Sequence, residues 1–91
     1  MSEYPYQDKI RTDDIVNCKS VFSSDGAAVG EVEAALADSF IVKAEEGDIE
    51  IKYEIPRLII DRIVDGSITL KQPKKIIQDK YETSSIKKNW E

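Results

Sequence analysis

Three features of this 91-residue chain could take part in chemistry: a single cysteine, several aspartates and a pair of closely spaced glycines. A nucleophilic Cys18 would need a neighbouring base or a positive field to form its thiolate. Lys19 is adjacent, but the chain contains no histidine, so the commonest general base and the commonest metal ligand are both missing. We therefore expect Cys18 to be a small buried or half-buried residue, and we expect the protein not to be an enzyme.

The carboxylates and glycines do not have the spacing of a ligand site. Five aspartates lie between residues 13 and 48: Asp13, Asp14, Asp25, Asp38 and Asp48. They do not follow the pattern of a calcium-binding loop. Gly26 and Gly30 are four residues apart, but no lysine with a following serine or threonine comes after them, as a phosphate-binding loop requires. The sequence thus predicts no metal site and no cofactor.

The charge of the chain is unevenly distributed. Thirteen basic and eighteen acidic residues give a formal net charge of −5, which argues against general nucleic-acid binding. Residues 71–91, however, hold six lysines and only three acidic residues. This basic segment could meet an anionic partner, or its lysines could simply form a solvated face that keeps the chain soluble.

The elements that must position these residues are short strands separated by turns. Residues 1–11 are expected to be a flexible leader, followed by about one helical turn from Thr12. Strands are expected over 20–23, 29–37, 40–44, 49–55 and 67–70. In the second, Val32, Ala34 and Leu36 should share one face. The clearest strand is 49–55, where isoleucines and a tyrosine alternate with charged residues until Pro56 ends the pattern.

The apolar pattern changes at both ends of the last strand. Residues 58–64 form an apolar cluster that fits either a strand or a buried turn. From Pro73 onward, Ile76, Ile77 and Tyr81 have helical spacing. Ile86 and Trp90 are again four residues apart. We expect residues 12–72 to form one β domain and residues 73–91 to form a C-terminal helix and tail.

These elements predict a mainly β fold, a small antiparallel barrel of about six strands with a C-terminal helix. Closure is favoured because so small a sheet must hide its edges. No apolar run is long enough to span a bilayer, and residues 1–9 lack the apolar core of a secretory signal. One cysteine cannot form an intramolecular disulfide, so a cytoplasmic location is expected.

Four short motifs follow one another in a defined order: Val21-Phe22-Ser23-Ser24-Asp25-Gly26, Val29-Gly30-Glu31-Val32, Tyr53-Glu54-Ile55-Pro56-Arg57 and Ile68-Thr69-Leu70. Over residues 12–72 this order resembles the PRC-barrel family. One departure is Cys18, which stands where the family usually has a glycine before the first strand. The resemblance implies a small, mostly antiparallel barrel without a shared active site, and it is closest to the stand-alone archaeal members.

The function that the resemblance implies is that of an adaptor. Some stand-alone archaeal members are linked to cell division and are thought to bind a SepF-type membrane anchor of the division ring. The expectation for this chain is therefore a cytoplasmic, homodimeric protein-binding adaptor that a partner recruits to the division site. Other PRC-barrel domains occur in photosynthetic reaction centres and in a ribosome maturation factor. A ribosome-maturation or RNA-associated adaptor is accordingly the alternative.

Candidate contact residues for a partner or for self-association come from the C-terminal segment: Ile77, Tyr81, Ile86 and Trp90. Aromatic residues are enriched at binding hot spots, and each pair in this set is spaced to share one helix face. Trp90 could equally be a tail residue that packs loosely on the domain.

Overall fold

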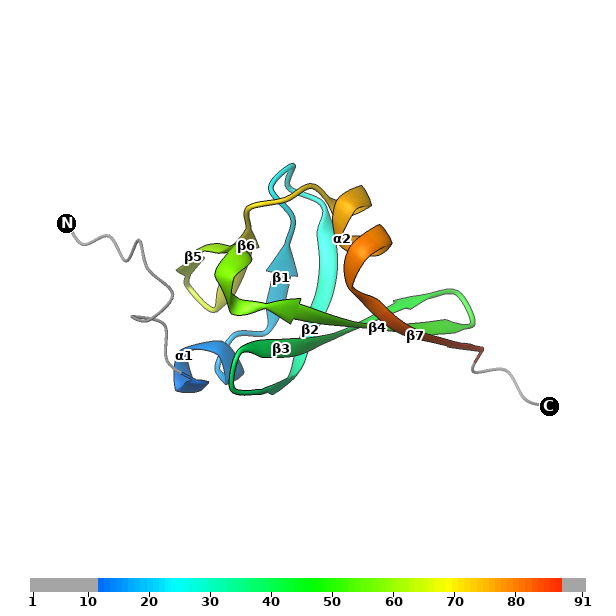
Figure 1. Cartoon of the computed structure of the whole chain (residues 1–91), viewed down its shortest axis with the longest axis horizontal. Helices are drawn as coiled ribbons and strands as arrows, with labels where there is room; N and C mark the ends of the chain where they lie inside the picture. Colours follow the sequence, from blue (N-terminus) through cyan, green and yellow to red (C-terminus); the bar gives the residue numbers. More distant parts are fainter. Residues whose placement is uncertain (1–11, 88–91) are drawn as a thin grey trace.

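A computed structural model of the chain describes residues 12–87, so the expected leader and Trp90 lie outside the described residues. Ten elements follow one another: α1 (Thr12–Val16), β1 (Ser20–Phe22), β2 (Ala28–Ala35), β3 (Ser39–Glu46), β4 (Ile49–Pro56), η2 (Arg57–Ile59), β5 (Ile60–Val64), β6 (Ser67–Leu70), α2 (Lys74–Tyr81) and β7 (Glu82–Lys87). The predicted mainly β class is confirmed (Figure 1).

All seven strands belong to one sheet, in the order β5-β6-β1-β2-β3-β4-β7. Within residues 12–87 the sheet is open, because β5 and β7 are its two edges and do not pair with each other. The expected closed barrel is therefore not present. The sheet is also mixed, since β1 and β6 are parallel while every other neighbouring pair is antiparallel.

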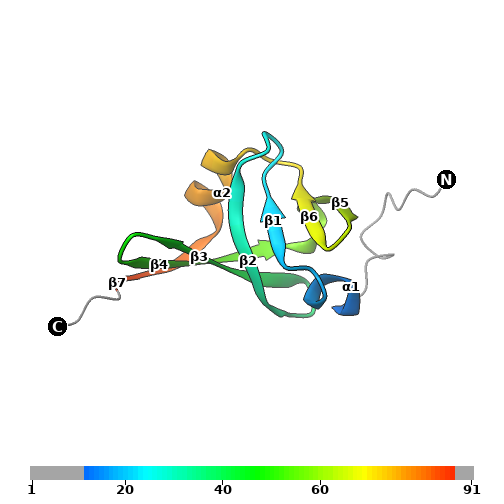
Figure 2. The ribbon, with the colours of Figure 1, turned by 180° about the vertical axis from the view of Figure 1, so that it is seen from behind.

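The strong twist of the sheet is visible in Figure 2, where β2 and β1 cross in front of the β3–β4 hairpin. At Gly30, β2 approaches the backbone of β3 closely. A Cβ atom at this position would come within 2.5 Å of the Lys43 carbonyl oxygen and 2.8 Å of Val42 Cγ1. Only glycine has room for so close an approach of two strands.

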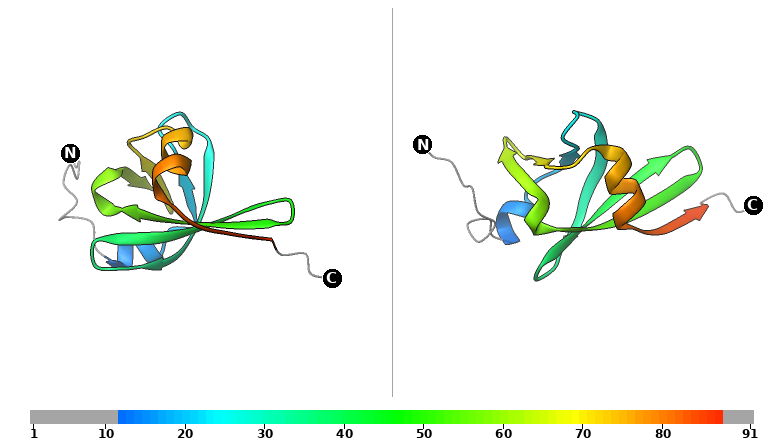
Figure 3. Two further views of the ribbon diagram at one scale, coloured as in Figure 1. Left: turned by 45° about the vertical axis from the view of Figure 1, so that its right-hand side comes forward. Right: turned by 45° about the horizontal axis from the view of Figure 1, so that its top comes forward.

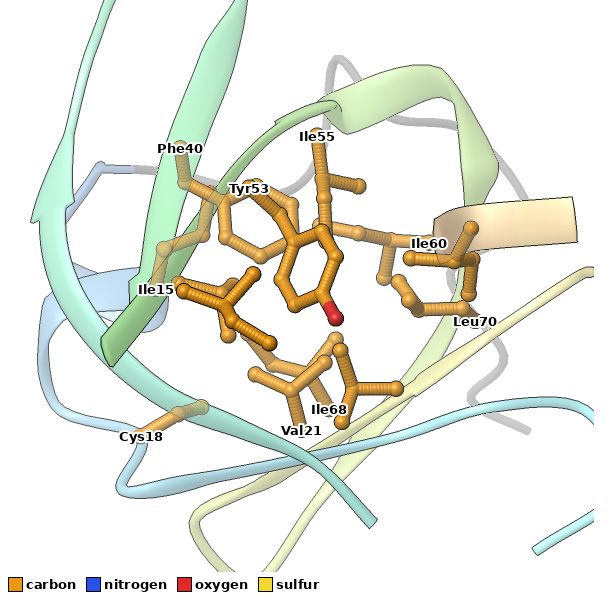
Figure 4. Close-up of a cluster of buried hydrophobic side chains, with 13 residues drawn as sticks. Ile15, Cys18, Val21, Phe40, Tyr53, Ile55, Ile60, Ile68 and Leu70 are labelled. Atoms are coloured by element: carbon orange, nitrogen blue, oxygen red, sulfur yellow. The ribbon is translucent and has the colours of Figure 1, made fainter. Parts of the chain in front are cut away.

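The core contains the inward residues that the alternation predicted for β4, namely Ile51, Tyr53 and Ile55. Figure 4 shows Tyr53 among Phe40, Ile55, Ile68 and Val21, with its hydroxyl inside the cluster. Cys18 is also buried, as expected. Burial of a large apolar side chain such as Phe40 or Ile55 stabilises the folded state by roughly 1.5–3 kcal/mol, so this cluster is the main source of stability.

The sequence pattern misplaced several apolar residues. A bulge between Val32 and Ala34 interrupts β2, which ends at Ala35, and Leu36 lies beyond it with 44% of its surface exposed. Val32, Ala34 and Leu36 therefore do not share one inward face, because a bulge shifts the alternation by one residue. The ambiguous cluster 58–64 divides into η2 and β5, with Ile60 buried and Leu58 exposed.

The C-terminal segment departs furthest from expectation. The helix ends at Tyr81, and the following residues form β7 along β4, where a tail was expected. Ile51 lies opposite Ser85, and Lys52 lies opposite Ser84. The Thr83 hydroxyl donates a hydrogen bond of 3.1 Å to the Lys52 carbonyl oxygen. The carbonyl and amide groups on the outer side of β4 need hydrogen-bond partners, and the C-terminal segment supplies them by forming a strand. This pairing has a larger effect on the segment than the weak helical spacing of Ile86.

Candidate interaction surface

The structure separates the four predicted contact residues. Ile77 is fully buried in the core, so its assignment as a partner contact is wrong. Its place on the inner side of α2 fixes this helix to the sheet. Tyr81 is half-buried and packs against the same core. Ile86 has 57% of its surface exposed on β7, and Trp90 lies outside the described residues.

Exposed Ile86 belongs to a projecting part of the sheet that we call the arm, made of residues 43–52 of β3 and β4 and residues 84–87 of β7. Figure 3 shows that the arm extends away from the rest of the molecule, which we call the body. Its hairpin register is regular, from Lys43 opposite Lys52 to Glu46 opposite Ile49. Ile49 continues the inward alternation of β4, yet it is 38% exposed because the arm reaches beyond the core.

One face of the arm is strongly polar. Lys52 Nζ lies 3.2 Å from Glu33 Oε1 on β2 and 3.9 Å from Glu50 Oε2 on its own strand. All three side chains are partly exposed, so these ion pairs contribute little to stability. They connect the base of the arm to β2. Exposed Ile86 lies opposite Glu50 on the same face.

The two edges of the sheet differ in how they are protected against pairing with another strand. β5 has five residues, a bulge between Ile60 and Arg62, and an exposed Asp61–Arg62 ion pair at 3.5 Å. Short length, bulges and charges are the usual means of blocking an edge. β7 has six residues, and the four in its middle, Thr83 to Ile86, include no charge, proline or glycine. Its pairing irregularity lies at its beginning, opposite Lys52 and Tyr53. β7 is therefore the less protected edge.

An open groove lies where the arm meets the body. The first residues of β2, the outer end of β3 and the beginning of α2 line it: Ala28, Val29, Gly30, Glu31, Lys43, Ala44, Glu45, Glu46 and Lys74. The lining combines small side chains with both acidic and basic groups. Such a lining suits a polar peptide segment better than an apolar small molecule.

Within the described range 12–87, three titratable groups have environments that shift their pKa, and all three have structural roles. Burial, together with the charge of Asp14, raises the pKa of the Cys18 thiol. The thiol donates a hydrogen bond of 3.1 Å to the Asp14 carbonyl oxygen, so it is held in its unreactive form. Burial also raises the pKa of Tyr53. A hydrogen bond from the Ser23 hydroxyl lowers the pKa of Asp25 in the turn between β1 and β2.

Arg57 and the aspartates are likewise placed in the framework. The Arg57 guanidinium donates to the Leu36 carbonyl oxygen, and its backbone N–H donates to the Asp38 carbonyl oxygen at 3.0 Å. The corner after β4 is thereby tied to the β2–β3 turn. Among residues 12–87, the cysteine and carboxylates form no cluster that could hold a metal ion. No helix in that range has the length and apolar character needed to cross a membrane.

The chain matches no protein-family model, and no curated protein or solved structure is significantly similar to it. The interaction surface must therefore be judged from its own geometry. Sequence reasoning found Ile86 but missed the β7 edge on which it lies. The available signal was the β-branched pair Thr83 and Ile86 beside Ser84 and Ser85, a composition that favours a strand over a helix.

Proposed function

We propose that this protein is a non-catalytic protein-binding adaptor and that the arm is its binding surface. The observation that carries the proposal is the projection of paired strands beyond the core, together with β7 as the less protected edge of the sheet that residues 12–87 form. Residues 45–49 at the tip are exposed and add little to the core. An extended sheet edge offers a row of backbone groups that a partner segment can join by strand addition.

The proposed partner is a SepF-type anchor of an archaeal division ring, and the cell-division role follows from the same family resemblance. Membership of the PRC-barrel family and the cytoplasmic location belong to this proposal as well. The open groove beside the arm supports it, because its mixed charge and small side chains suit a polar peptide. The absence of histidine from the full chain supports the non-catalytic part.

The test is capture by the tagged protein at two salt concentrations, read by mass spectrometry. Ile86→Asp places a charge on the arm, and Leu58→Asp does the same at a comparably exposed position on the body. Recovery of division-ring anchor proteins by the wild type and by Leu58→Asp, together with their loss from Ile86→Asp, supports the proposal. Equal recovery by both variants would remove the arm from it.

The alternative is an RNA-associated or ribosome-maturation adaptor, and the lysines around α2 favour it. Lys71, Lys75 and Lys80 are all exposed. Binding through such lysines would release counterions, so RNA and ribosomal proteins would be recovered only at the lower salt concentration. That result, with no effect of Ile86→Asp, would mean that the surface around α2, and not the arm, is the binding surface.

A further inference from the structure

We propose that the outer edge of β7 pairs with β7 of a second copy of this chain, so that two seven-stranded sheets join antiparallel into one. The inference rests on the proposed function in that it names the occupant of the arm's edge. The faces of the arm and the groove at its base remain for a different partner.

The first observation is the contrast between the two edges. β5 carries the charged pair Asp61 and Arg62 within the strand, whereas the middle of β7 is neutral and includes exposed Ile86. In an isolated monomer this edge would leave a row of backbone donors and acceptors available for pairing. Pairing with an identical strand provides hydrogen-bond partners for the β7 edges of both copies at once. The assembly then stops at two copies, because neither β7 edge remains unpaired in a two-fold dimer.

The second observation is the distribution of charge along the arm, which decides the orientation. β7 starts at the end of α2 and runs outward, with Glu82 opposite Tyr53 near the body and Lys87 opposite Ile49 near the tip (Figure 3). The tip of the hairpin is acidic, with Glu45, Glu46, Asp48 and Glu50. The beginning of the arm adjoins α2, which carries three lysines and one aspartate, namely Lys74, Lys75, Asp79 and Lys80.

Antiparallel pairing places the acidic tip of each arm toward the lysine-bearing α2 end of the other copy, and it does so twice. Parallel pairing would place the two acidic tips side by side, where like charges repel. The charge pattern therefore complements a second copy in the antiparallel orientation. This argument uses the exposed tip residues and α2 lysines and requires no change in the fold.

The register follows from symmetry. A two-fold axis perpendicular to a sheet passes through a pair made of the same residue from both copies, because paired side chains must lie on the same face. The regular part of the edge is 84–87, and self-pairing of Ser85 is the register that places each exposed Ile86 opposite a small side chain. Ser84 of each copy then lies opposite Ile86 of the other, so that the two serines partly cover the exposed isoleucines.

The experiment is sedimentation equilibrium of the full chain over a range of concentrations, with charge-reversal variants. The wild type should form a dimer. Reversal of the tip by Glu46→Lys with Asp48→Lys should weaken dimerisation by about tenfold at low salt, as expected for a few exposed charge pairs. Adding Lys75→Glu with Lys80→Glu should restore it. The control, Asp38→Lys with Asp61→Lys, makes the same change in net charge on the body and should not weaken the dimer.

A second measurement locates the contact. Ser85→Cys should be cross-linked into a dimer by a short bismaleimide, whereas Asp61→Cys on the β5 edge should not be. The wild type is the background, because its own Cys18 is buried. Monomeric behaviour at all concentrations, equal cross-linking of both variants or failure of the charge rescue would each overturn the proposal.

The two proposals fail separately. A monomer that still loses its partner on Ile86→Asp would end the dimer and keep the adaptor. A dimer with the expected charge rescue and no protein partner at either salt concentration would keep the dimer and end the adaptor.

Discussion

Strands β3 and β4 run through both the body and the arm, yet the two regions differ in what stabilises them. In the body, inward residues such as Phe40 and Tyr53 are almost completely buried, and Gly30 allows two strands to approach closely. In the arm, the same alternation continues on β4, but Ile49 remains partly exposed. Strand pairing alone shapes the arm, whereas the body is held by a core. A part of a small protein that adds little burial is a natural place for binding.

The largest expected effect compares a large side chain from each region. Phe40→Ala should lower the free energy of unfolding by about 3–5 kcal/mol, because it leaves a cavity in the core. Ile49→Ala should lower it by less than about 1 kcal/mol, since its side chain already contacts water. Urea unfolding followed by circular dichroism measures both. Similar losses for the two variants would mean that the arm is as tightly packed as the body.

The next comparison uses two glycines. Gly30→Ala should cost about 2–3 kcal/mol, because the new methyl group would overlap the backbone oxygen of Lys43. Gly47 lies at the arm tip with a φ of +63° and nothing within 4 Å of the added carbon. Gly47→Ala should therefore cost only about 1 kcal/mol, from backbone strain alone. A larger loss at Gly47, measured by the same unfolding titration, would contradict this distinction between the crossing and the tip.

The pH dependence of stability tests two groups in the core, and its expected effect is smaller. The pKa values of Tyr53 and Cys18 are raised above ordinary values of 10.0 and 9.0, so the folded state holds these protons more tightly than the unfolded state. Their contribution is complete below about pH 9 and is lost as pH rises through the raised pKa values. Tyr53→Phe should reduce the slope of stability against pH above pH 9, at a cost of about 1 kcal/mol for the lost hydrogen bond between the Tyr53 hydroxyl and the Gln78 side chain. An unchanged slope would show that Tyr53 ionises equally well in both states.

The smallest expected change in the free energy of unfolding comes from a substitution at the base of the arm. Lys52→Met removes the ion pairs with Glu33 and Glu50 but keeps an apolar stem, and it should change the free energy of unfolding by less than about 0.5 kcal/mol. Added salt should reduce the difference further. Thermal unfolding at two salt concentrations measures it. A loss above about 1 kcal/mol would mean that these charges, and not only the backbone ladder, hold the arm in place.

Much of the body could be predicted from the residues, and little of the candidate site could. The charged–apolar alternation of β4 correctly placed Ile51, Tyr53 and Ile55 inward, and Pro73 correctly marked the beginning of α2. Ile77 was misassigned because a helical stripe shows which residues are buried together, but not whether the covering surface is the same chain or a partner. β7 was missed because its six residues have no strong period of their own.

The sequence by itself determined the mainly β class, the turns and the inward faces, since these depend on local periodicity and on the conformations of proline and glycine. The tertiary structure alone decided the strand order, the parallel pairing of β1 with β6, the open edges and the conversion of the C-terminal segment into β7. These features depend on which backbone groups remain unpaired after the rest of the sheet has formed. That is a property of residues far apart in the chain, and no local pattern records it.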